Sequence, residues 1–363
     1  MEIVDIKIGE IDLPLSKSYT RGCIVVKESE EIVVKVFTEC GEVGVGSAVA
    51  TPNITGETKE SIIGAIRYLR PLIIGQKVEN IEGIMKIVNK ALMFNNSAKA
   101  AIDMALYDLM GKSFGVPLYK LLGGHQNSIS TSITINFAST EEMVSNALEA
   151  IMKGYSSLKL KVGYDAATDI ARITAIRKAI RKGINLRIDA NQGWRPKEAV
   201  KIIRTLEDLG LDIEFIEQPV KAWDVEGLQY VTDHVATEIL ADESVLGPPS
   251  AFKVIKSNVA DLISIKLMKS GGLHNAIKIY DMADTTDIRT MMGCMLESKI
   301  GITAAASLAV AKINMIQSDL DTMFTYNSDH IIGGANISGD TITLPEKPGL
   351  GIEEVLGFKE IKG

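Results

Sequence analysis

Residues 156–191 read SSLKLKVGYDAATDIARITAIRKAIRKGINLRIDAN. The first apolar stretch carries Lys159 and Lys161, and the second ends in Asp189. Side chains two apart on a strand point to the same face, so the two lysines share one side of the first predicted strand. A helix-length segment separates the two stretches. The piece therefore predicts a parallel strand–helix–strand unit.

The same unit recurs from residue 128 onward. The predicted strands are ISTSITINF, SSLKLKVG, INLRIDAN, IEFIEQP, EILADES, LISIKLMKSG, IRTMMGCMLES and MIQSDLDT. The predicted helices between them cover 140–153, 166–182, 196–208, 224–234, 249–257, 273–285 and 299–312. Eight such strands favour an α/β fold built on a closed TIM-type barrel, with an open doubly wound sheet as the alternative. No obvious barrel helix follows the last strand.

The segments on either side of the barrel pattern differ from it. Residues 1–124 predict a small α+β domain, with strands at 2–9, 23–27 and 31–38 and helices at 57–70, 79–92 and from Ser97. The polar stretch LSKSYTRG, residues 15–22, reads as a loop, and the glycines of GEVGVGSAV as a turn in a meander. The barrel is assigned to 125–330. Residues 331–363, with a strand at TITL, are expected to return to the first domain.

The composition excludes several classes of protein. The 363 residues are 46% hydrophobic and 23% charged, with a net charge of −7, so neither nucleic acid nor an anionic membrane is an expected partner. The acidic N-terminus has no apolar signal core, and no apolar run is long enough to span a bilayer. Three cysteines without metal or redox spacing fit a reducing compartment. We expect a cytoplasmic protein.

Charged residues end most of the predicted strands. The set is Lys159 and Lys161, Asp189, Glu217, Asp242, Lys266, Glu297, and Asp319 with Asp321. From Lys161 to Asp321 the gaps are 28, 28, 25, 24, 31 and 24 residues, about one strand–helix unit each. In a closed barrel these residues converge on the mouth that holds the active site.

The acids Asp189, Glu217 and Asp242 come from three consecutive predicted strands. Three oxygen ligands suit a hard cation, best Mg²⁺, with Mn²⁺ as an alternative. Zn²⁺ does not fit, because none of the four histidines has a ligand-like partner. The alternative reading is a salt-bridge network with the lysines. Asn191 points the same way as Asp189 and is expected to support it.

Lys161 and Lys266 belong to strands that lie roughly opposite each other in a barrel. A metal between two amines suggests proton transfer at a carbon, with the metal stabilising an enolate. One lysine would remove the α-proton and the other would deliver a proton to the opposite face. Lys159 and the cation would lower the pKa of Lys161. The alternative reading is two surface lysines on an edge strand.

These residues resemble the enolase superfamily, in its muconate lactonizing enzyme subgroup. The matching motifs are KLK at 159–161, DAN at 189–191, EQP at 217–219, DES at 242–244 and KLMKSGG at 266–272. The resemblance covers nearly the whole chain. It implies a capping domain, a (β/α)7β barrel and a C-terminal return to the cap, with lysine bases and Mg²⁺.

Within that subgroup the chain looks most like the dipeptide epimerases, which carry a D-x-D motif, here Asp319-Leu320-Asp321. The resemblance implies that these two carboxylates bind the α-ammonium group of an L,L-dipeptide, whose carboxylate would chelate the metal and whose C-terminal residue would be epimerised. Two further substrate-binding candidates are Thr134, on the first predicted barrel strand, and Glu297, in the motif GCMLES at 293–298. A homo-oligomer is expected.

The commonest substrate in this group is L-Ala-L-Glu, from murein peptide turnover. In such enzymes a basic residue of the early capping loop usually meets the glutamate side chain. Here Ile24 stands where that arginine is expected, and Arg21 lies nearby. A broader or more hydrophobic dipeptide range is therefore open, and residues 16–25 are expected to form a lid that determines it.

Two other functions stay open on the sequence. An o-succinylbenzoate synthase or cycloisomerase would use the same scaffold, but its substrate has no ammonium group for Asp319 and Asp321. A non-catalytic metal-binding barrel would leave the opposed lysines Lys161 and Lys266 without a role.

Overall fold

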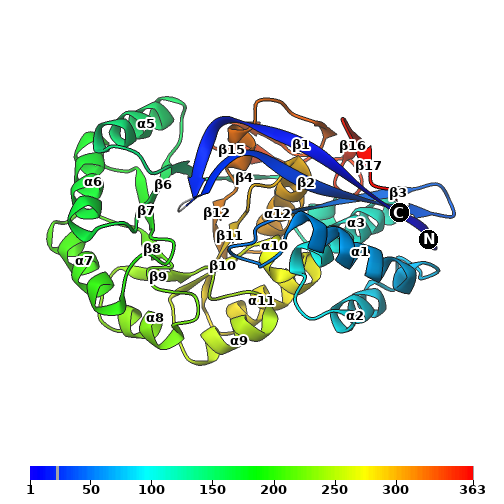
Figure 1. The fold of residues 1–363 in the computed structure, drawn as a ribbon, viewed down its shortest axis with the longest axis horizontal. Coiled ribbons are helices and arrows are strands. Elements are labelled where there is room, and N and C mark those ends of the chain that lie inside the picture. Colours follow the sequence, from blue (N-terminus) through cyan, green and yellow to red (C-terminus); the bar gives the residue numbers. More distant parts are fainter. Residues whose placement is uncertain (22–23, 363) are drawn as a thin grey trace.

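A barrel of eight parallel strands forms the centre of the protein, in a computed structural model that describes residues 1–21 and 24–362 (Figure 1). Its strands follow one another in chain order around the sheet. They are β5 (Ile133–Ile135), β6 (Ser157–Lys161), β7 (Asn185–Asp189), β8 (Phe215–Glu217), β9 (Glu238–Ala241), β10 (Leu262–Ile265), β11 (Arg289–Gly293) and β12 (Met315–Asp319). The two edges meet where the Ser132 N–H donates to the Ser318 carbonyl oxygen, at 3.2 Å. The predicted barrel is confirmed, and the doubly wound alternative is wrong because the strand order never reverses.

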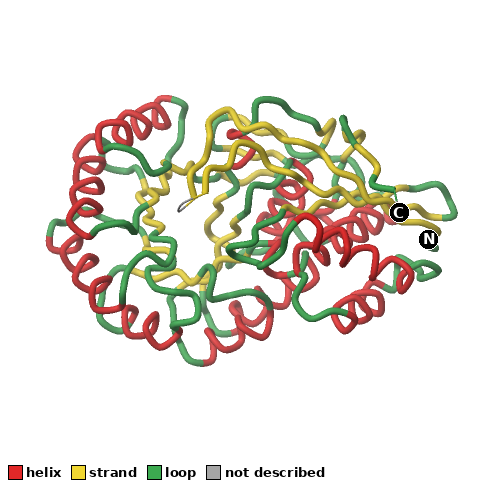
Figure 2. The backbone as a smooth tube through the Cα atoms, viewed as in Figure 1, coloured by secondary structure: helices red, strands yellow, loops and turns green. Residues whose placement is uncertain are grey.

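Helices surround the barrel as an outer layer, seen in red around the yellow strands in Figure 2. They are α5 (Thr140–Met152), α6 (Ala166–Ala179), α7 (Pro196–Asp208), α8 (Val225–Thr232), α9 (Pro248–Lys256), α11 (Leu273–Thr285) and α12 (Lys299–Ala311). The short helix α10 (Leu267–Ser270) follows β10, and the 3-10 turn η1 (Thr322–Thr325) comes after β12. Across residues 1–21 and 24–362, no helix has the length and apolar character needed to cross a bilayer.

Successive side chains along a barrel strand point to opposite faces of the sheet, and each face packs into its own buried cluster. Phe215, Leu240, Leu262 and Met291 form a small buried cluster of their own. Their chain neighbours, such as Ile216, belong to the larger core, which includes the helices. A strand buried on both faces reads as a continuous apolar run, which is why these strands stand out in the sequence.

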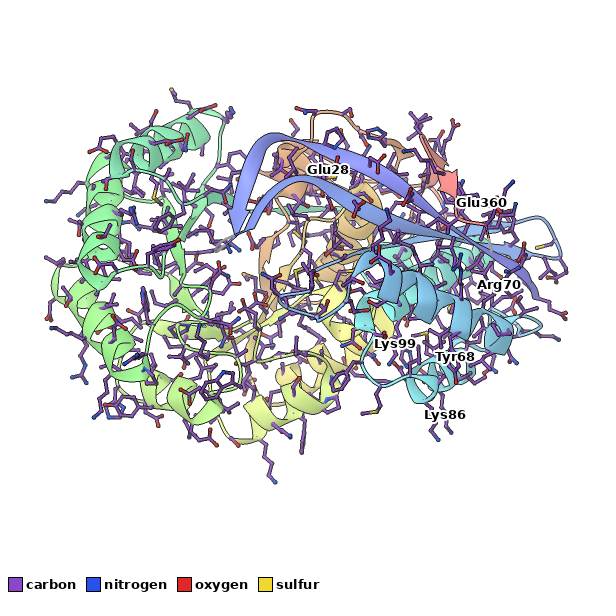
Figure 3. The ribbon with its side chains drawn as sticks, in the orientation of Figure 1. Glu28, Tyr68, Arg70, Lys86, Lys99 and Glu360 are labelled. Carbon is purple, nitrogen blue, oxygen red and sulfur yellow. The ribbon has the colours of Figure 1, made fainter. Side chains whose placement is uncertain are left out.

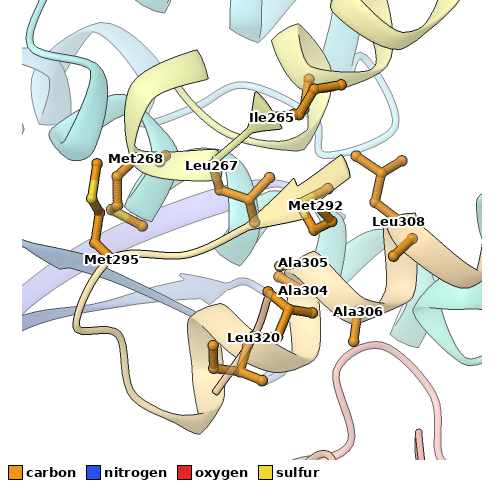
Figure 4. Close-up of a cluster of buried hydrophobic side chains, with 14 of the residues drawn as sticks. Ile265, Leu267, Met268, Met292, Met295, Ala304, Ala305, Ala306, Leu308 and Leu320 are labelled. Atoms are coloured by element: carbon orange, nitrogen blue, oxygen red, sulfur yellow. The ribbon is translucent and has the colours of Figure 1, made fainter. Parts of the chain in front are cut away.

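Helix α12 is rich in alanine and packs closely against the barrel. Figure 4 shows Ala304 beside Leu320, and Met295 beside Met268. All four side chains are buried in the main core. Small residues on α12 let large ones from the loops after β11 and β12 fill the space between helix and strands.

The first domain is an antiparallel sheet covered by helices. Its strands are β1 (Ile3–Arg21), β2 (Ile24–Thr38) and β3 (Val43–Val49). The loop predicted at residues 15–22 is wrong for residues 15–21, which belong to β1. Of the two strands predicted at 23–27 and 31–38, residues 24–27 and 31–38 are parts of the single strand β2. Backbone pairing continues from Tyr19–Val26 to Arg21–Ile24 beyond a register shift after Pro14. This cross-strand pairing satisfies the backbone of a polar segment that has no apolar pattern of its own.

The helices of the first domain are α1 (Lys59–Ile73), α2 (Ile81–Ala91), α3 (Asn96–Phe114) and α4 (Leu118–Leu121). The exposed Tyr68 and Lys86 extend from α1 and α2 (Figure 3). Helix α3 lies directly against β3, because a Cβ at Gly46 would stand 1.9 Å from the Ala101 carbonyl oxygen. The glycines of β3 therefore allow close packing of strand and helix, and only Gly41 lies in the turn before the strand.

The last part of the chain contacts both domains. The strands β14 (Asn336–Ser338) and β15 (Thr341–Thr343) form a small sheet with β4 (Ser128–Ser130). The predicted first barrel strand, 129–137, is thus wrong at its start, and only β5 joins the barrel. After β13 (Ile331–Gly333) and β16 (Ile352–Val355), the strand β17 (Lys359–Glu360) pairs with β1 at Gly9 and Glu10.

A buried carboxyl group joins α3 to the barrel. Asp103 is fully buried and accepts hydrogen bonds from the backbone N–H groups of Leu273 and His274, at the start of α11. Burial raises the pKa of Asp103 to about 8, against the opposing effect of these hydrogen bonds. Between about pH 4 and pH 8 the folded protein therefore holds a proton here that the unfolded chain has released.

This difference predicts that the stabilising contribution of Asp103 falls as the pH rises through that interval. Asp103→Asn keeps an oxygen acceptor but does not titrate. The free energy of unfolding of the variant, from urea titrations between pH 5 and pH 8, should decline less steeply than that of the unchanged protein. If the free energy of unfolding falls equally with pH in both proteins, Asp103 is not the group that titrates.

Candidate active site

The mouth of the barrel gathers the charged residues that end its strands. The strand register places Lys161 beside Asp189, and Asp189 beside Glu217. Asp242 directly follows β9, and Lys266 directly follows β10. Since β6 and β10 are four strands apart in a barrel of eight, Lys161 and Lys266 stand on opposite sides of the mouth.

A cavity of about 150 Å³ opens between these two lysines. Its polar lining contains Thr134, Asn136, Lys159, Lys161, Asn191, Asp242, Lys266, Asp319, Asp321, Thr322 and Thr325. Its apolar lining comes from Ile54 of the first domain and from Ile133, Met295, Leu296 and Phe324 of the barrel. Most of the predicted site residues therefore meet in one cavity, with a residue of the cap beside them.

The lysines and carboxylates form ion pairs across the mouth. The Lys161 Nζ lies 2.6 Å from the Asp189 Oδ2, and the Lys266 Nζ lies 2.7 Å from the Asp242 Oδ2. Lys159 is paired with Asp319 and lies 3.7 Å from Glu217. Each carboxylate is almost completely buried, so its charge needs these ammonium groups.

The pKa values follow from this burial and pairing. Burial disfavours the charge on Lys159, but the carboxylates of Asp319 and Glu217 raise its pKa well above the usual range. Burial would also lower the pKa of Lys266, but the neighbouring Asp242 carboxylate outweighs it and raises that pKa. These pairs thus hold both amines protonated, and positive charge added beside the carboxylates would weaken that effect.

Asp319 and Asp321 lie together at one end of the cavity. The Ser132 hydroxyl donates to Asp319 at 3.0 Å, and the Thr134 N–H donates to Asp321 at 2.7 Å. Burial raises the pKa of Asp321, and the charge of Asp319 adds to the shift. Two adjacent carboxylates, of which Lys159 compensates one, leave this end of the cavity suited to a further cation.

The three acids predicted as metal ligands lie next to one another. Both oxygens of Glu217 are buried and accept no hydrogen bond from any described residue. Burial raises the pKa of Glu217, and the charges of Asp189 and Asp242 raise it further. Such a set of oxygen donors fits a hard divalent cation.

As they stand, no three His, Cys, Asp or Glu side chains in the described part of the chain enclose a position for a metal ion. Lysine ammonium groups are bonded to the oxygens of Asp189 and Asp242 instead. A cation would therefore have to displace Lys161 and Lys266 from these carboxylates.

Two strand-end turns beside the acids have unusual backbone conformations. Asn191 and Gln218 have φ values of 44° and 38°. Asn191 accepts a hydrogen bond from Lys161 at 2.8 Å, and its N–H donates to Asp189 at 2.9 Å. The Gln218 side chain accepts from the Asp242 N–H at 2.9 Å. A strained backbone conformation persists only where surrounding contacts hold it, and such conformations are concentrated at functional sites.

Several residues of this site were missed in the sequence. Lys269 is buried and paired with Asp242, and its Nζ also donates to the Ser264 carbonyl oxygen at 3.2 Å. Its position three residues after Lys266 was the available signal. Ser132 and Gln218 had no distinguishing signal, since a serine in a strand and a glutamine in a turn are common.

Five predicted residues are not among the described residues that line the cavity, namely Asp189 and Glu217, described above, and Glu297, Arg21 and Ile24. Glu297 is buried, and its carboxylate accepts a hydrogen bond from the Met295 N–H at 2.9 Å. Burial raises the pKa of Glu297 to about 7. The backbones of Arg21 and Ile24 pair at the end of the β1–β2 hairpin, but their side chains lie outside the described part of the structure.

Comparison with protein families gives two matches that together span most of the chain. Residues 13–123 match the mandelate racemase / muconate lactonizing enzyme N-terminal domain. Residues 142–354 match the enolase C-terminal domain-like family. The residues between the two matches, 124–141, include β4 and the first barrel strand β5.

Individual relatives match over nearly their whole length. An L-Ala-D/L-Glu epimerase of Clostridium acetobutylicum is 47% identical over 98% of this chain and 99% of its own. The substrate-liganded L-Ala-D/L-Glu epimerase of Bacillus subtilis has a TM-score of 0.96 at 45% identity, over 98% of this chain and 99% of its own. The dipeptide epimerase of Enterococcus faecalis, complexed with Mg and L-Leu-L-Tyr, has a TM-score of 0.95 at 42% identity, over 98% of this chain and 100% of its own.

Proposed function

This chain belongs to the enolase-like mandelate racemase / muconate lactonizing enzyme family, and we propose that it is a dipeptide epimerase that inverts the α-carbon of the C-terminal residue. The observation that carries the proposal is the pair Lys161 and Lys266 on opposite sides of one cavity, with Asp319 and Asp321 at its end. Relatives named as epimerases of L-Ala-D/L-Glu and of hydrophobic dipeptides support it.

The two lysines act on opposite faces of the α-carbon. One accepts the α-proton, and the other returns a proton from the far side, so the configuration inverts. Lys159 does not contact the reacting carbon in this scheme. Its ammonium group compensates Asp319 and adds positive charge near Lys161. Asn191 holds Lys161 in place.

Asp189, Glu217 and Asp242 would hold a magnesium ion. When bound, the ion supplies positive charge that stabilises the negative charge developing on the dipeptide carboxylate. Mg²⁺ is proposed rather than Mn²⁺ because solved relatives contain it.

The dipeptide is oriented by its two charged ends. Its ammonium group binds Asp319 and Asp321, and Thr134 fixes Asp321 by a backbone hydrogen bond. Between the ends, Ile54, Leu296 and Phe324 present apolar surface.

The described lysines that line the cavity are already paired with carboxylates. We therefore propose a range that extends beyond L-Ala-L-Glu to dipeptides with apolar side chains. Four further points stay predictions. They are the role of Arg21, Ile24 and Glu297 in specificity, a homo-oligomeric state, a cytoplasmic location and a role in murein peptide turnover.

The reaction predicts α-deuteration of dipeptides in D₂O with Mg²⁺. L-Ala-L-Leu and L-Ala-L-Glu should both exchange and epimerise at the C-terminal residue, followed by NMR. Lys161→Ala and Lys266→Ala should each lower epimerisation by on the order of 10²- to 10⁴-fold. Each variant should still exchange the α-proton of one epimer, because one base remains. If no dipeptide exchanges with the unchanged enzyme, the proposal is wrong.

The magnesium site predicts a stability effect that does not depend on catalysis. At Mg²⁺ concentrations about 100 times the dissociation constant, binding should raise the free energy of unfolding by about 2.7 kcal/mol. Glu217→Gln should lose most of this gain. Glu214→Gln is the control, because Glu214 pairs with Arg187 and is not among the proposed ligands. An equal Mg²⁺ effect in both variants would exclude Glu217 as a ligand.

The ammonium site predicts discrimination against blocked dipeptides. The unchanged enzyme should process L-Ala-L-Leu with a much higher kcat/KM than N-acetyl-L-Ala-L-Leu. Asp321→Asn should lower kcat/KM for the free dipeptide by about 30-fold or more, since one partner of a buried charge pair is lost. It should change the value for the acetylated dipeptide far less. Equal losses for both substrates would place the ammonium group elsewhere.

A further inference from the structure

The β1–β2 hairpin of the first domain contacts the two loops that follow β11 and β12. On β2, the Ser29 hydroxyl donates to the Leu296 carbonyl oxygen at 2.9 Å. Two residues further, Glu31 accepts hydrogen bonds from the Ser298 N–H at 2.7 Å and from its hydroxyl at 2.8 Å. On β1, the Pro14 carbonyl oxygen accepts from the Asn327 N–H at 3.0 Å.

Glu31 is an unusual residue for this position. It is a fully buried carboxyl group in β2, directly before the apolar run Ile32, Val33 and Val34. Burial raises its pKa to about 8. Its partner Ser298 is the N-cap of α12, so Glu31 adds a second hydrogen-bond acceptor at the start of that helix, where backbone N–H groups lack partners within the helix.

The segment held by Ser29 and Glu31 forms one wall of the substrate cavity. Met295 and Leu296 both line it, next to Cys294. The Thr322 hydroxyl donates to the Glu297 carbonyl oxygen at 3.1 Å, which joins this segment to the loop that contains Asp321. The wall therefore stands beside the carboxylates proposed to bind the dipeptide ammonium group, where the N-terminal side chain would lie.

We propose that Ser29 and Glu31 are positioning residues that fix Met295 and Leu296 and so determine which N-terminal side chain of a dipeptide is accepted. The inference rests on the proposed epimerase function. Neither residue lines the cavity, and both act through the backbone of residues 296–298.

The test compares dipeptides that differ only at the N-terminal residue, L-Ala-L-Leu, L-Val-L-Leu and L-Phe-L-Leu. Ser29→Ala and Glu31→Ala should change the ratios of kcat/KM among these substrates by at least about fivefold, the scale on which an apolar pocket discriminates side chains. The change should lie in KM, with kcat for L-Ala-L-Leu within about twofold. Glu31→Gln, which keeps the volume and one acceptor, should restore most of the original ratios.

Asp108→Asn supplies the matched control. Asp108 is also a fully buried carboxyl group of the first domain, and it accepts from the N–H groups of Val45 at 3.0 Å and Leu350 at 2.7 Å. It should lower the melting temperature without changing the substrate ratios. If Ser29→Ala and Glu31→Ala also leave the ratios unchanged in an active enzyme, the inference is overturned and the epimerase function stands. An unchanged protein that epimerises none of the dipeptides overturns both.

Discussion

Charge compensation inside the barrel mouth is the constraint on which the rest of the site depends. Carboxylates and ammonium groups that are almost completely buried alternate there, namely Asp189, Glu217, Asp242 and Asp319 with Lys159, Lys266 and Lys269. An unpaired charge in such a place is strongly destabilising, so each group is stable only with its partners. The same coupling makes the mouth responsive, because a cation that binds the carboxylates weakens the hold on the lysines. In the proposed reaction, the protonated lysines of the ion pairs and the basic lysines that accept a proton would be two states of one network.

The barrel could be predicted from the sequence because most of its strands are apolar stretches that end in a charged residue. The β1–β2 hairpin could not, since residues 15–21 are paired through their backbone and carry no apolar alternation. The prediction of where the barrel starts was wrong for a related reason. Residues 128–130, Ser-Ile-Ser, alternate in polarity like the residues of β5 that follow them, and a partner more than 200 residues away, β15, draws them into another sheet. Pairing between distant segments leaves little trace in local sequence.

For the site, the sequence predicted residues that share a position at the strand ends, and the structure brings Lys161, Lys266, Asp319 and Asp321 to one cavity. The sequence did not predict residues whose contacts are hydrogen bonds to the backbone or to another side chain of the site. Ser132, Gln218 and Glu31 are examples, because their roles depend on which carbonyl or amide group lies opposite. Glu297 shows the reverse case, since its place in a strand-end motif predicted a substrate contact, whereas its buried carboxylate accepts a hydrogen bond from the Met295 N–H and does not line the cavity.

The pairing of β17 with β1 has a consequence for how the chain is made. The first domain cannot complete its sheet until residues 359 and 360 have been synthesised, although most of its strands are among the first residues to emerge. Until then β1 has an open edge, which can pair with other chains. Both termini also lie at the same end of the molecule (Figure 1). A circularly permuted chain, in which a short linker joins residue 362 to residue 1, would place β17 directly before β1 in the chain and so shorten that exposed interval.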